Sequence, residues 1–302
     1  MMEKLQKLGR HIKKEYFGML FVMPVILGLL IFTFVPVGVS LVYSLHDVSR
    51  RGELENFGVQ HYISMFTTNA SFVWPKLWAT VKYTIIVIPL TMVLSFSLAY
   101  VLNREMKGIK MARVLCYAPV VIPTVVSGII WRRITESGDG YLNLLLEMLH
   151  LPPYDFFSNP DTALPSFIGM GLFGIGSGMI LWLSQLKNIP RTLYESADLE
   201  GANEFQQLFC ITIPMCTPTI FYTLITNVIG TLQVFDMAKI FSMPDNKPAL
   251  DFFVLYIFEE GIELAHRGYG AALSWVLFAI IATLSAIMFK TSKWVYYGED
   301  FN

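Results

Sequence analysis

Charged residues are scarce in this sequence. Asp, Glu, Lys and Arg make up 15% of its 302 residues, apolar residues make up 54%, and the mean hydropathy is +0.53. A soluble globular domain carries about 25% charged residues. The composition therefore indicates an integral membrane protein. The net charge of -1 gives no reason to expect a nucleic-acid partner.

Residues that carry catalytic or metal chemistry are few and scattered. The three cysteines, Cys116, Cys210 and Cys216, have no metal or redox spacing and lie in or beside apolar segments, which favours inert thiols. The five histidines form no cluster along the chain. A phosphate loop of the form G-x-x-x-x-G-K-S/T is also absent from the sequence. We therefore expect a chain that is not an enzyme, does not hydrolyse ATP and holds no metal.

Long apolar runs are what the sequence does contain. A membrane-spanning helix needs roughly 20 apolar residues. We predict an all-α membrane protein with six spans, at about 17–45, 77–102, 114–131, 166–186, 213–235 and 271–289. They form one transmembrane domain, 17–294, between an N-terminal segment, 1–16, and a tail, 295–302. A short amphipathic helix is expected at 141–149 in a loop on the outer side.

Glycine is concentrated in the fourth predicted span, which has five glycines. Gly174 and Gly178 are separated by three residues, the spacing that lets two helices approach closely in a membrane. The same glycines leave room for a local break, and close packing is the favoured interpretation.

Lys and Arg are distributed unevenly between the loops. Thirteen of the 22 lie in the N-terminal segment, the loop after the second span, the loop after the fourth span and the C-terminal end. Cytoplasmic loops carry an excess of Lys and Arg. These parts are therefore predicted to face the cytoplasm, together with both termini. Arg132 and Arg133, at the outer end of the third span, weaken this bias without reversing it.

A polar stretch from Glu195 to Pro218 interrupts the apolar second half of the chain, and it begins within a loop predicted at 187–212. Thr192, with Glu195 three residues later, has the spacing of a capping box at the start of a helix. Gly201 permits a turn or the close approach of another chain. From these residues alone, an ordinary loop helix between two spans is favoured over a docking element.

The same stretch carries a known motif. It reads Glu195-Ser196-Ala197, three residues, Gly201, nine residues, then Ile211-Thr212-Ile213-Pro214. This resembles the EAA motif of the permease subunits of bacterial ABC importers, E-A-A-x3-G-x9-I-x-L-P. The departures are Ser196 in place of Ala and Ile213 in place of Leu.

Neighbouring residues narrow the resemblance. Ile189-Pro190, Leu193-Tyr194 and the run from Gln233 to Asp236 are similar to the sugar importers of the carbohydrate uptake type 1 family. Within that family they resemble the MalF/LacF/UgpA-like permease subunit. In place of the family's Thr-Gly-Gly-Pro loop, this chain has Phe241 to Asp245, so details of the outer gate are not carried over.

The resemblance implies a type I ABC importer permease in the bacterial plasma membrane. Its partners would be a second, MalG-like permease subunit forming a heterodimer, two ATPase subunits, an extracellular solute-binding protein and a sugar. ATP and Mg²⁺ would sit on the ATPases, and this chain would bind no cofactor. The residues that the resemblance assigns to a coupling helix against the ATPase are Glu195, Ser196, Ala197, Asp198, Gly201, Ala202, Ile211 and Pro214.

The fifth span has a polar side, formed at helical spacing by Thr223, Thr226, Asn227, Gly230, Thr231 and Gln233. Polar side chains in a span face a path or another helix, and both interpretations stay open. Asn227 and Gln233 are candidates for hydrogen bonds to a sugar. The residues predicted for the substrate path are Tyr222, Asn227, Thr231, Gln233, Asp236 and Trp275.

Two alternatives remain. One is an ABC importer permease for glycerol phosphate, a peptide or an amino acid. The other is a secondary transporter acting alone, which would more often carry charges inside its spans or a visible repeat.

Overall fold

The structure, a computed structural model, describes residues 18–49, 51–104 and 106–296. The predicted N-terminal segment, 1–16, and residues 297–302 of the predicted tail lie outside the described residues. Helices dominate, as predicted. The exception is one short antiparallel hairpin, β1 (Asp47–Val48) and β2 (Leu54–Glu55), in which Asp47 lies opposite Glu55.

Within the described residues, four helices are long and apolar enough to cross a membrane. The first, Gly18–Ser44, contains a π-helical stretch, Leu30–Phe34, followed by α2 (Val35–Ser44). The others are α4 (Ala70–Leu102), the helix Thr217–Phe241, and α17 (Arg267–Lys290). Thr217–Phe241 comprises α13 (Thr217–Leu232) and α14 (Asp236–Phe241). The number of spans rises to six if each of two sharply bent helix pairs counts as one.

Helix α4 begins at Ala70, before the predicted start of the second span at 77. Its 33 residues reach about 50 Å at 1.5 Å per residue, which exceeds the roughly 30 Å of a bilayer core. The apolar pattern of the sequence marks only the part of α4 that is compatible with lipid, so the predicted span leaves out residues 70–76. Pro75 and Pro89 lie inside α4 without ending it.

The third predicted span is not one straight helix. It consists of α5 (Ile109–Tyr117) with a 3-10 turn at Ala118–Val121, then α6 (Thr124–Ile134), and the two parts meet at 98°. The break falls at Ile122, which is extended with ψ 128°. Pro123 follows it, and a residue before proline is pushed out of the helical region.

The fourth predicted span bends by 47° between Pro160–Gly174 and Gly176–Asn188. These parts contain α8 (Pro160–Gly171), a 3-10 turn at Leu172–Gly174, and α9 (Gly176–Asn188). The predicted close packing of helices is therefore confirmed at Gly178 and wrong at Gly174. Gly178 packs tightly against Ser95 of α4, whereas a side chain at Gly174 would meet open space.

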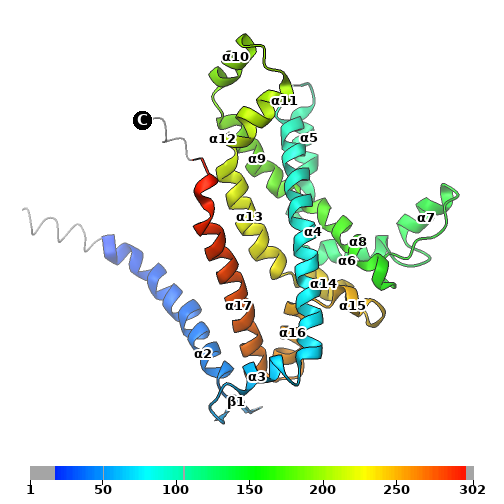
Figure 1. The fold of residues 1–302 in the computed structure, drawn as a ribbon. Helices are drawn as coiled ribbons and strands as arrows, with labels where there is room; N and C mark the ends of the chain where they lie inside the picture. Colours follow the sequence, from blue (N-terminus) through cyan, green and yellow to red (C-terminus); the bar gives the residue numbers. More distant parts are fainter. Residues whose placement is uncertain (1–17, 50, 105, 297–302) are drawn as a thin grey trace, which may run out of the picture.

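The helices form an elongated bundle (Figure 1). Helix α4 runs along it and packs against α9 and α13. At one end, here named the α10 end, lie α10 (Arg191–Leu199), α11 (Glu204–Gln207) and α12 (Ile213–Met215), joined by a π-helical stretch at Leu208–Thr212. At the other, the β1 end, lie the hairpin and α3 (Gln60–Phe66).

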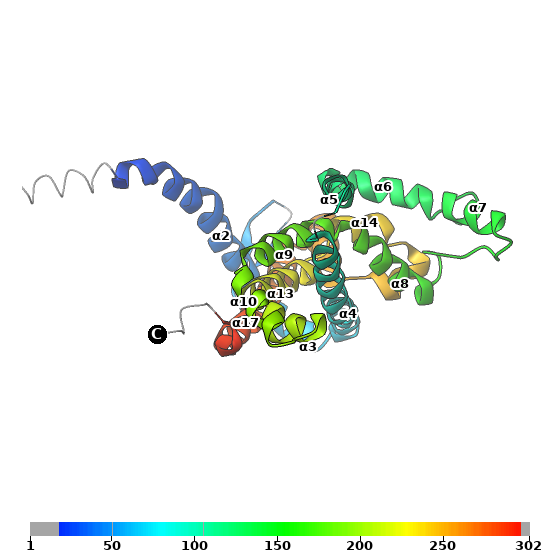
Figure 2. The ribbon, with the colours of Figure 1, turned by 90° about the horizontal axis from the view of Figure 1, so that it is seen from above.

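Short helices fill the region near the β1 end. They are α15 (Lys247–Leu250) after a 3-10 turn at Pro244–Asn246, and α16 (Phe253–Phe258) before a π-helical turn at Glu259–Glu263. A last 3-10 turn, Ser292–Trp294, follows α17 at the α10 end. The expected helix at 141–149 is present as α7 (Tyr141–Met148), and it projects sideways from the bundle (Figure 2).

Candidate functional site

Helix α10 stands clear of the bundle at the α10 end, and none of its residues is buried. Pro190 occupies the N-cap position, with no side chain capping the helix. The predicted capping box at Thr192 and Glu195 is therefore wrong, because the helix starts at Arg191 and takes Thr192 into its first turn. A capping box lies instead at Asn203 and Gln206, where it starts α11.

Gly201 ends α10, as the sequence predicts. Its φ of +80° lies in the left-handed region that favours glycine. The amide of Gly201 donates to the Asp198 carbonyl at 3.0 Å, and that of Ala202 donates to Ala197 at 2.9 Å. These two bonds form a Schellman motif, which satisfies the last carbonyls of the helix and turns the chain sharply into α11.

Three side-chain contacts hold this turn, two within the segment 191–212 and one to the loop after α4. The Tyr194 hydroxyl lies 2.8 Å from the Thr212 hydroxyl, and burial raises the pKa of Tyr194 above its ordinary value. The Gln207 amide donates to the Asp198 carboxylate at 2.6 Å. Arg104, in the loop after α4, pairs with Glu204 of α11 at 3.1 Å. The helical turn is thus held in place from its inner side.

The outer side of the turn exposes apolar side chains. We name the residues Glu195, Leu199, Phe205 and Phe209 the α10–α11 surface. Leu199 is 91% exposed, Phe205 75% and Phe209 63%. The Glu195 carboxylate has no ion-pair or hydrogen-bond partner among the described residues. Large exposed apolar side chains beside an unpaired charge are typical of a surface that another protein covers.

The other predicted coupling residues lie on the same segment. Ser196 and Asp198 are exposed, Ala197, Ala202 and Ile211 are half-buried, and Pro214 occupies the first turn of α12. A contact between the end of this segment and the neighbouring helix α9 was not predicted from the sequence. The Gln185 amide of α9 donates to the carbonyl of Met215 at 2.8 Å, where α12 gives way to α13.

A polar cavity of about 300 Å³ lies between α4, α9 and α13. Asn227, Thr223 and Thr226 of α13 line it, so the cavity collects three members of the predicted polar side. Both threonine hydroxyls donate to carbonyls of their own helix. The Asn227 amide has no partner among the described residues, so its donors and acceptor are available to a solute.

The remaining wall of the cavity includes Gly174 and Gly178, which the sequence singles out, and other residues that it does not. Thr91 and Ser95 of α4 line it, with Trp182 of α9. The Trp182 ring nitrogen donates to the Ser95 hydroxyl at 3.0 Å, which holds the buried indole in place. One signal was available, because Thr84, Thr91 and Ser95 recur at the spacing of one helix face.

The other residues predicted for the path lie outside this cavity. Tyr222 is 56% exposed, and Gln233 is the exposed residue that ends α13. Asp236 begins α14 and is exposed. Thr231 donates to the Asn227 carbonyl within α13, and Trp275 of α17 packs on Phe278. The structure thus brings Asn227, but not these five, together with the polar side chains of α4 and α9.

A buried ion pair near the β1 end was also missed. Lys76 of α4 lies 2.5 Å from Asp251, which precedes α16, and the Lys76 side chain is 10% exposed. The Lys76 ammonium also lies 4.6 Å from the centre of the Tyr256 ring. One helical turn further on, the Thr80 hydroxyl accepts from the amide of Phe253 at 2.8 Å. These contacts attach α16 to α4.

Comparison with solved structures identifies the class of fold. The chain superposes on a chain in the crystal structure of a bacterial alginate ABC transporter in complex with an alginate-bound periplasmic protein. The TM-score is 0.84 at 20% sequence identity, and 94% of this chain and 96% of that chain are covered. With its long apolar helices, this chain is a multi-pass membrane protein with the fold of an ABC transporter permease.

Relatives in sequence identify the family. The chain is 34% identical over 298 residues to a probable ABC transporter permease protein, YesP, of Bacillus subtilis, covering 96% of each. It is 27% identical to the trehalose/maltose transport system permease protein MalF of Thermococcus litoralis, covering 91% of this chain and 93% of that protein. No protein-family model matches the chain. The chain belongs to the family of ABC transporter permeases.

Proposed function

We propose that this chain is the MalF-like permease subunit of an ATP-driven importer of sugars or oligosaccharides. The observation that carries the proposal is the continuity of two features. The α10–α11 surface occupies one end of the segment that continues through α12 into α13, and α13 lines the polar cavity with Asn227. A force applied at the surface therefore has a short route to the cavity.

In this proposal the chain crosses the membrane six times, with each bent helix pair counted as one span. Both termini and the α10 end face the cytoplasm, in line with the Lys and Arg bias. Helix α10 is the coupling helix, and its site residues are those of the motif from Glu195 to Pro214. The chain itself is not a catalyst and holds no cofactor. ATP is hydrolysed by two partner ATPase subunits.

A second, MalG-like permease completes the path as a heterodimer, and an extracellular solute-binding protein delivers the solute to the β1 end. Asn227 provides hydrogen bonds to sugar hydroxyls, and the aromatic face of Trp182 closes the cavity. Such a combination of polar groups and flat apolar surface suits a saccharide. Gln233, Thr231, Tyr222, Asp236 and Trp275 remain proposed path residues beyond the cavity.

The test is ATP-dependent uptake. The permease would be reconstituted in liposomes with its partner permease, ATPase and binding protein, and radiolabelled solutes would be offered as a panel of mono- and oligosaccharides, glycerol phosphate, a peptide and an amino acid. We expect uptake of one or more saccharides that requires ATP and the binding protein. Uptake of only a non-saccharide would replace the proposed substrate. ATP-independent uptake by this chain alone would contradict the proposal.

A further inference from the structure

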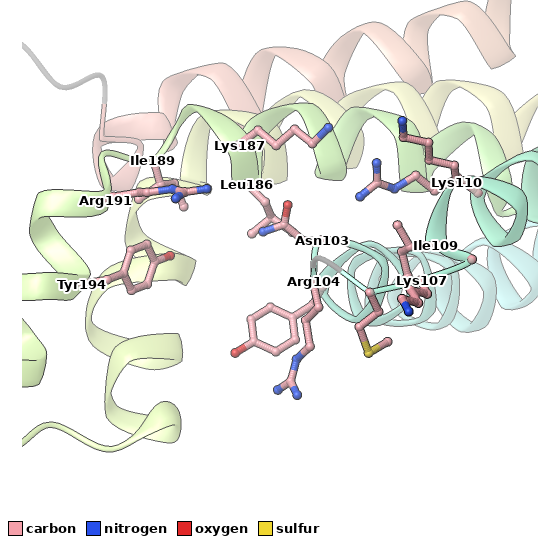
Figure 3. Close-up of a pocket in the computed structure, with 14 residues that line it drawn as sticks. Asn103, Arg104, Lys107, Ile109, Lys110, Leu186, Lys187, Ile189, Arg191 and Tyr194 are labelled. Carbon is pink, nitrogen blue, oxygen red and sulfur yellow. The ribbon is translucent and has the colours of Figure 1, made fainter.

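A cleft of about 980 Å³ lies at the α10 end and has no role in the proposal above. Residues 103–104 and 106–108 with the start of α5 line one side of it, and the end of α9 with the start of α10 lines the other. Figure 3 shows Lys107 and Lys110 on the first side, and Lys187 and Arg191 on the second.

The lining of this cleft is positively charged. It includes six basic side chains, Arg104, Lys107, Lys110, Arg113, Lys187 and Arg191, and none of the described lining residues is acidic. Three of the six have other interactions, and Arg191 is one of these. Arg104 pairs with Glu204, and Arg113 donates to the carbonyl of Leu102 at 2.7 Å, where α4 ends. Lys107, Lys110 and Lys187 have no partner among the described residues.

Like charges that line one hollow repel each other unless an anion lies among them. Lys ammonium groups are established phosphate ligands. Gly108, in the left-handed region with φ +89°, turns the loop so that Lys107 and Lys110 line the same cleft. Among the described residues, the cleft thus provides converging donors and no acidic counterion.

The nature of the anion follows from the surroundings of the cleft. Lys110 and Arg113 lie on α5, whose outward apolar residues Met111, Val114 and Leu115 are each more than 60% exposed. A basic end joined to an exposed apolar face fits a molecule with an anionic head and acyl chains. Basic pockets between transmembrane helices on the cytoplasmic side bind such headgroups.

We propose that this cleft binds the phosphate headgroup of an anionic phospholipid, held by Lys107, Lys110 and Lys187, with its acyl chains along α5. Assignment to the cytoplasmic leaflet rests on the proposed function. A lipid bound here contacts both the loop after α4 and the base of α10, so it stabilises α10 in one position relative to α5.

The test measures lipid binding directly and does not depend on transport. The full-length chain in detergent micelles is titrated with phosphatidylglycerol, and bound lipid is counted by native mass spectrometry. We expect saturable binding of phosphatidylglycerol and no comparable binding of phosphatidylcholine. Because each Lys near an anionic headgroup contributes about 1 kcal/mol, the triple variant Lys107→Gln/Lys110→Gln/Lys187→Gln should bind about a hundredfold more weakly.

The matched control is Lys290→Gln/Lys293→Gln, which removes two charges from the end of α17 at the α10 end, outside the cleft, and should bind like the wild type. If the triple variant does not fold, the single variant Lys187→Gln should still bind about fivefold more weakly.

Three results would overturn the proposal. The first is unchanged binding in the triple and single variants. The second is displacement of phosphatidylglycerol by inorganic phosphate or glycerophosphoglycerol at the same concentration, which would assign the site to a soluble phosphate. The third is loss of the ATPase subunits from the triple variant with lipid binding intact, which would make the cleft a protein contact.

Discussion

Asn227 is the residue on which the proposed path depends most. Asn227 lines the cavity, and its side-chain amide has no partner among the described residues. The neighbouring threonine hydroxyls, in contrast, already donate to carbonyls of their own helix. A solute that replaces water in the cavity would therefore gain its hydrogen bonds mainly from Asn227.

Replacing Asn227 with Ala should weaken uptake. Loss of one hydrogen bond to a neutral solute costs about 1 kcal/mol, so the solute concentration for half-maximal uptake should rise about fivefold. Gln233→Ala, at the exposed end of α13, is measured alongside, since both residues were predicted for the path. Normal uptake with normal affinity in both variants would remove this face of α13 from the path.

Lys76 and Asp251 form the buried pair that joins α16 to α4. Removing one partner of a buried pair leaves the other charge without compensation and costs about 3–5 kcal/mol. Lys76→Met should therefore lower the thermal midpoint of the purified protein strongly. The double variant Lys76→Met/Asp251→Leu should recover most of the loss. Equal losses in the single and double variants would mean that the two residues are not coupled.

Among the elements, the start of α9 approaches the backbone at the end of α5 closely, and it does so at a glycine. A side chain at Gly176 would overlap the backbone carbonyl of Cys116, whereas one at Gly174 would meet open space. Gly176→Ala should therefore destabilise the protein by about 1–3 kcal/mol through overpacking. Gly174→Ala is the matched control and should leave the thermal midpoint close to that of the wild type. A larger loss in Gly174→Ala than in Gly176→Ala would contradict this packing.

The long apolar helices could be predicted from the sequence, because runs of apolar residues depend only on local composition. The short helices α3, α15 and α16 lie outside the predicted spans and were not predicted. Their breaks could not. Pro89 lies within the continuous helix α4, whereas Pro123 follows a bend of 98°. Proline removes one hydrogen bond in both cases, and the packing of neighbouring helices decides whether the helix continues. The sequence alone does not contain that packing.

The two parts of the candidate site, the turn at Gly201 and the cavity, differ in the same way: the turn depends on local sequence and the cavity on packing between distant elements. The turn at Gly201 follows from residues adjacent in sequence, and it was predicted correctly. The cavity needs α4, α9 and α13 together, so only its α13 side was predicted. The Ser95 to Trp182 contact joins residues 87 positions apart, and Lys76 to Asp251 joins residues 175 apart. Such pairs leave no local pattern.

At the scale of the whole molecule, the α10–α11 surface and the cavity belong to one continuous stretch of chain. The contacts of Tyr194, Gln207 and Arg104 hold one side of the α10–α11 turn, and the apolar side chains on its other side are exposed. The first helix diverges from the bundle along most of its length (Figures 1 and 2), and none of its apolar window is buried within the chain. In the proposed transporter, that helix would contact lipid or the second permease, and the α10–α11 surface would contact the ATPase.

In the proposed function, ATP hydrolysis drives transport through α10 and its turn. Gly201→Asp tests this proposal, because Asp is among the residues found at positive φ and a Cβ at this position would meet nothing within 4 Å in the described structure. The variant should fold and enter the membrane. Gly138→Asp is the matched control, with φ +88° and open space, in the loop before α7.

The measurement is the ratio of sugar taken up to ATP hydrolysed in proteoliposomes that contain the complete transporter. We predict a ratio close to that of the wild type for Gly138→Asp and a loss of most ATP-driven uptake for Gly201→Asp, with the variant still present in the membrane. Wild-type assembly and a wild-type ratio for Gly201→Asp would contradict the account.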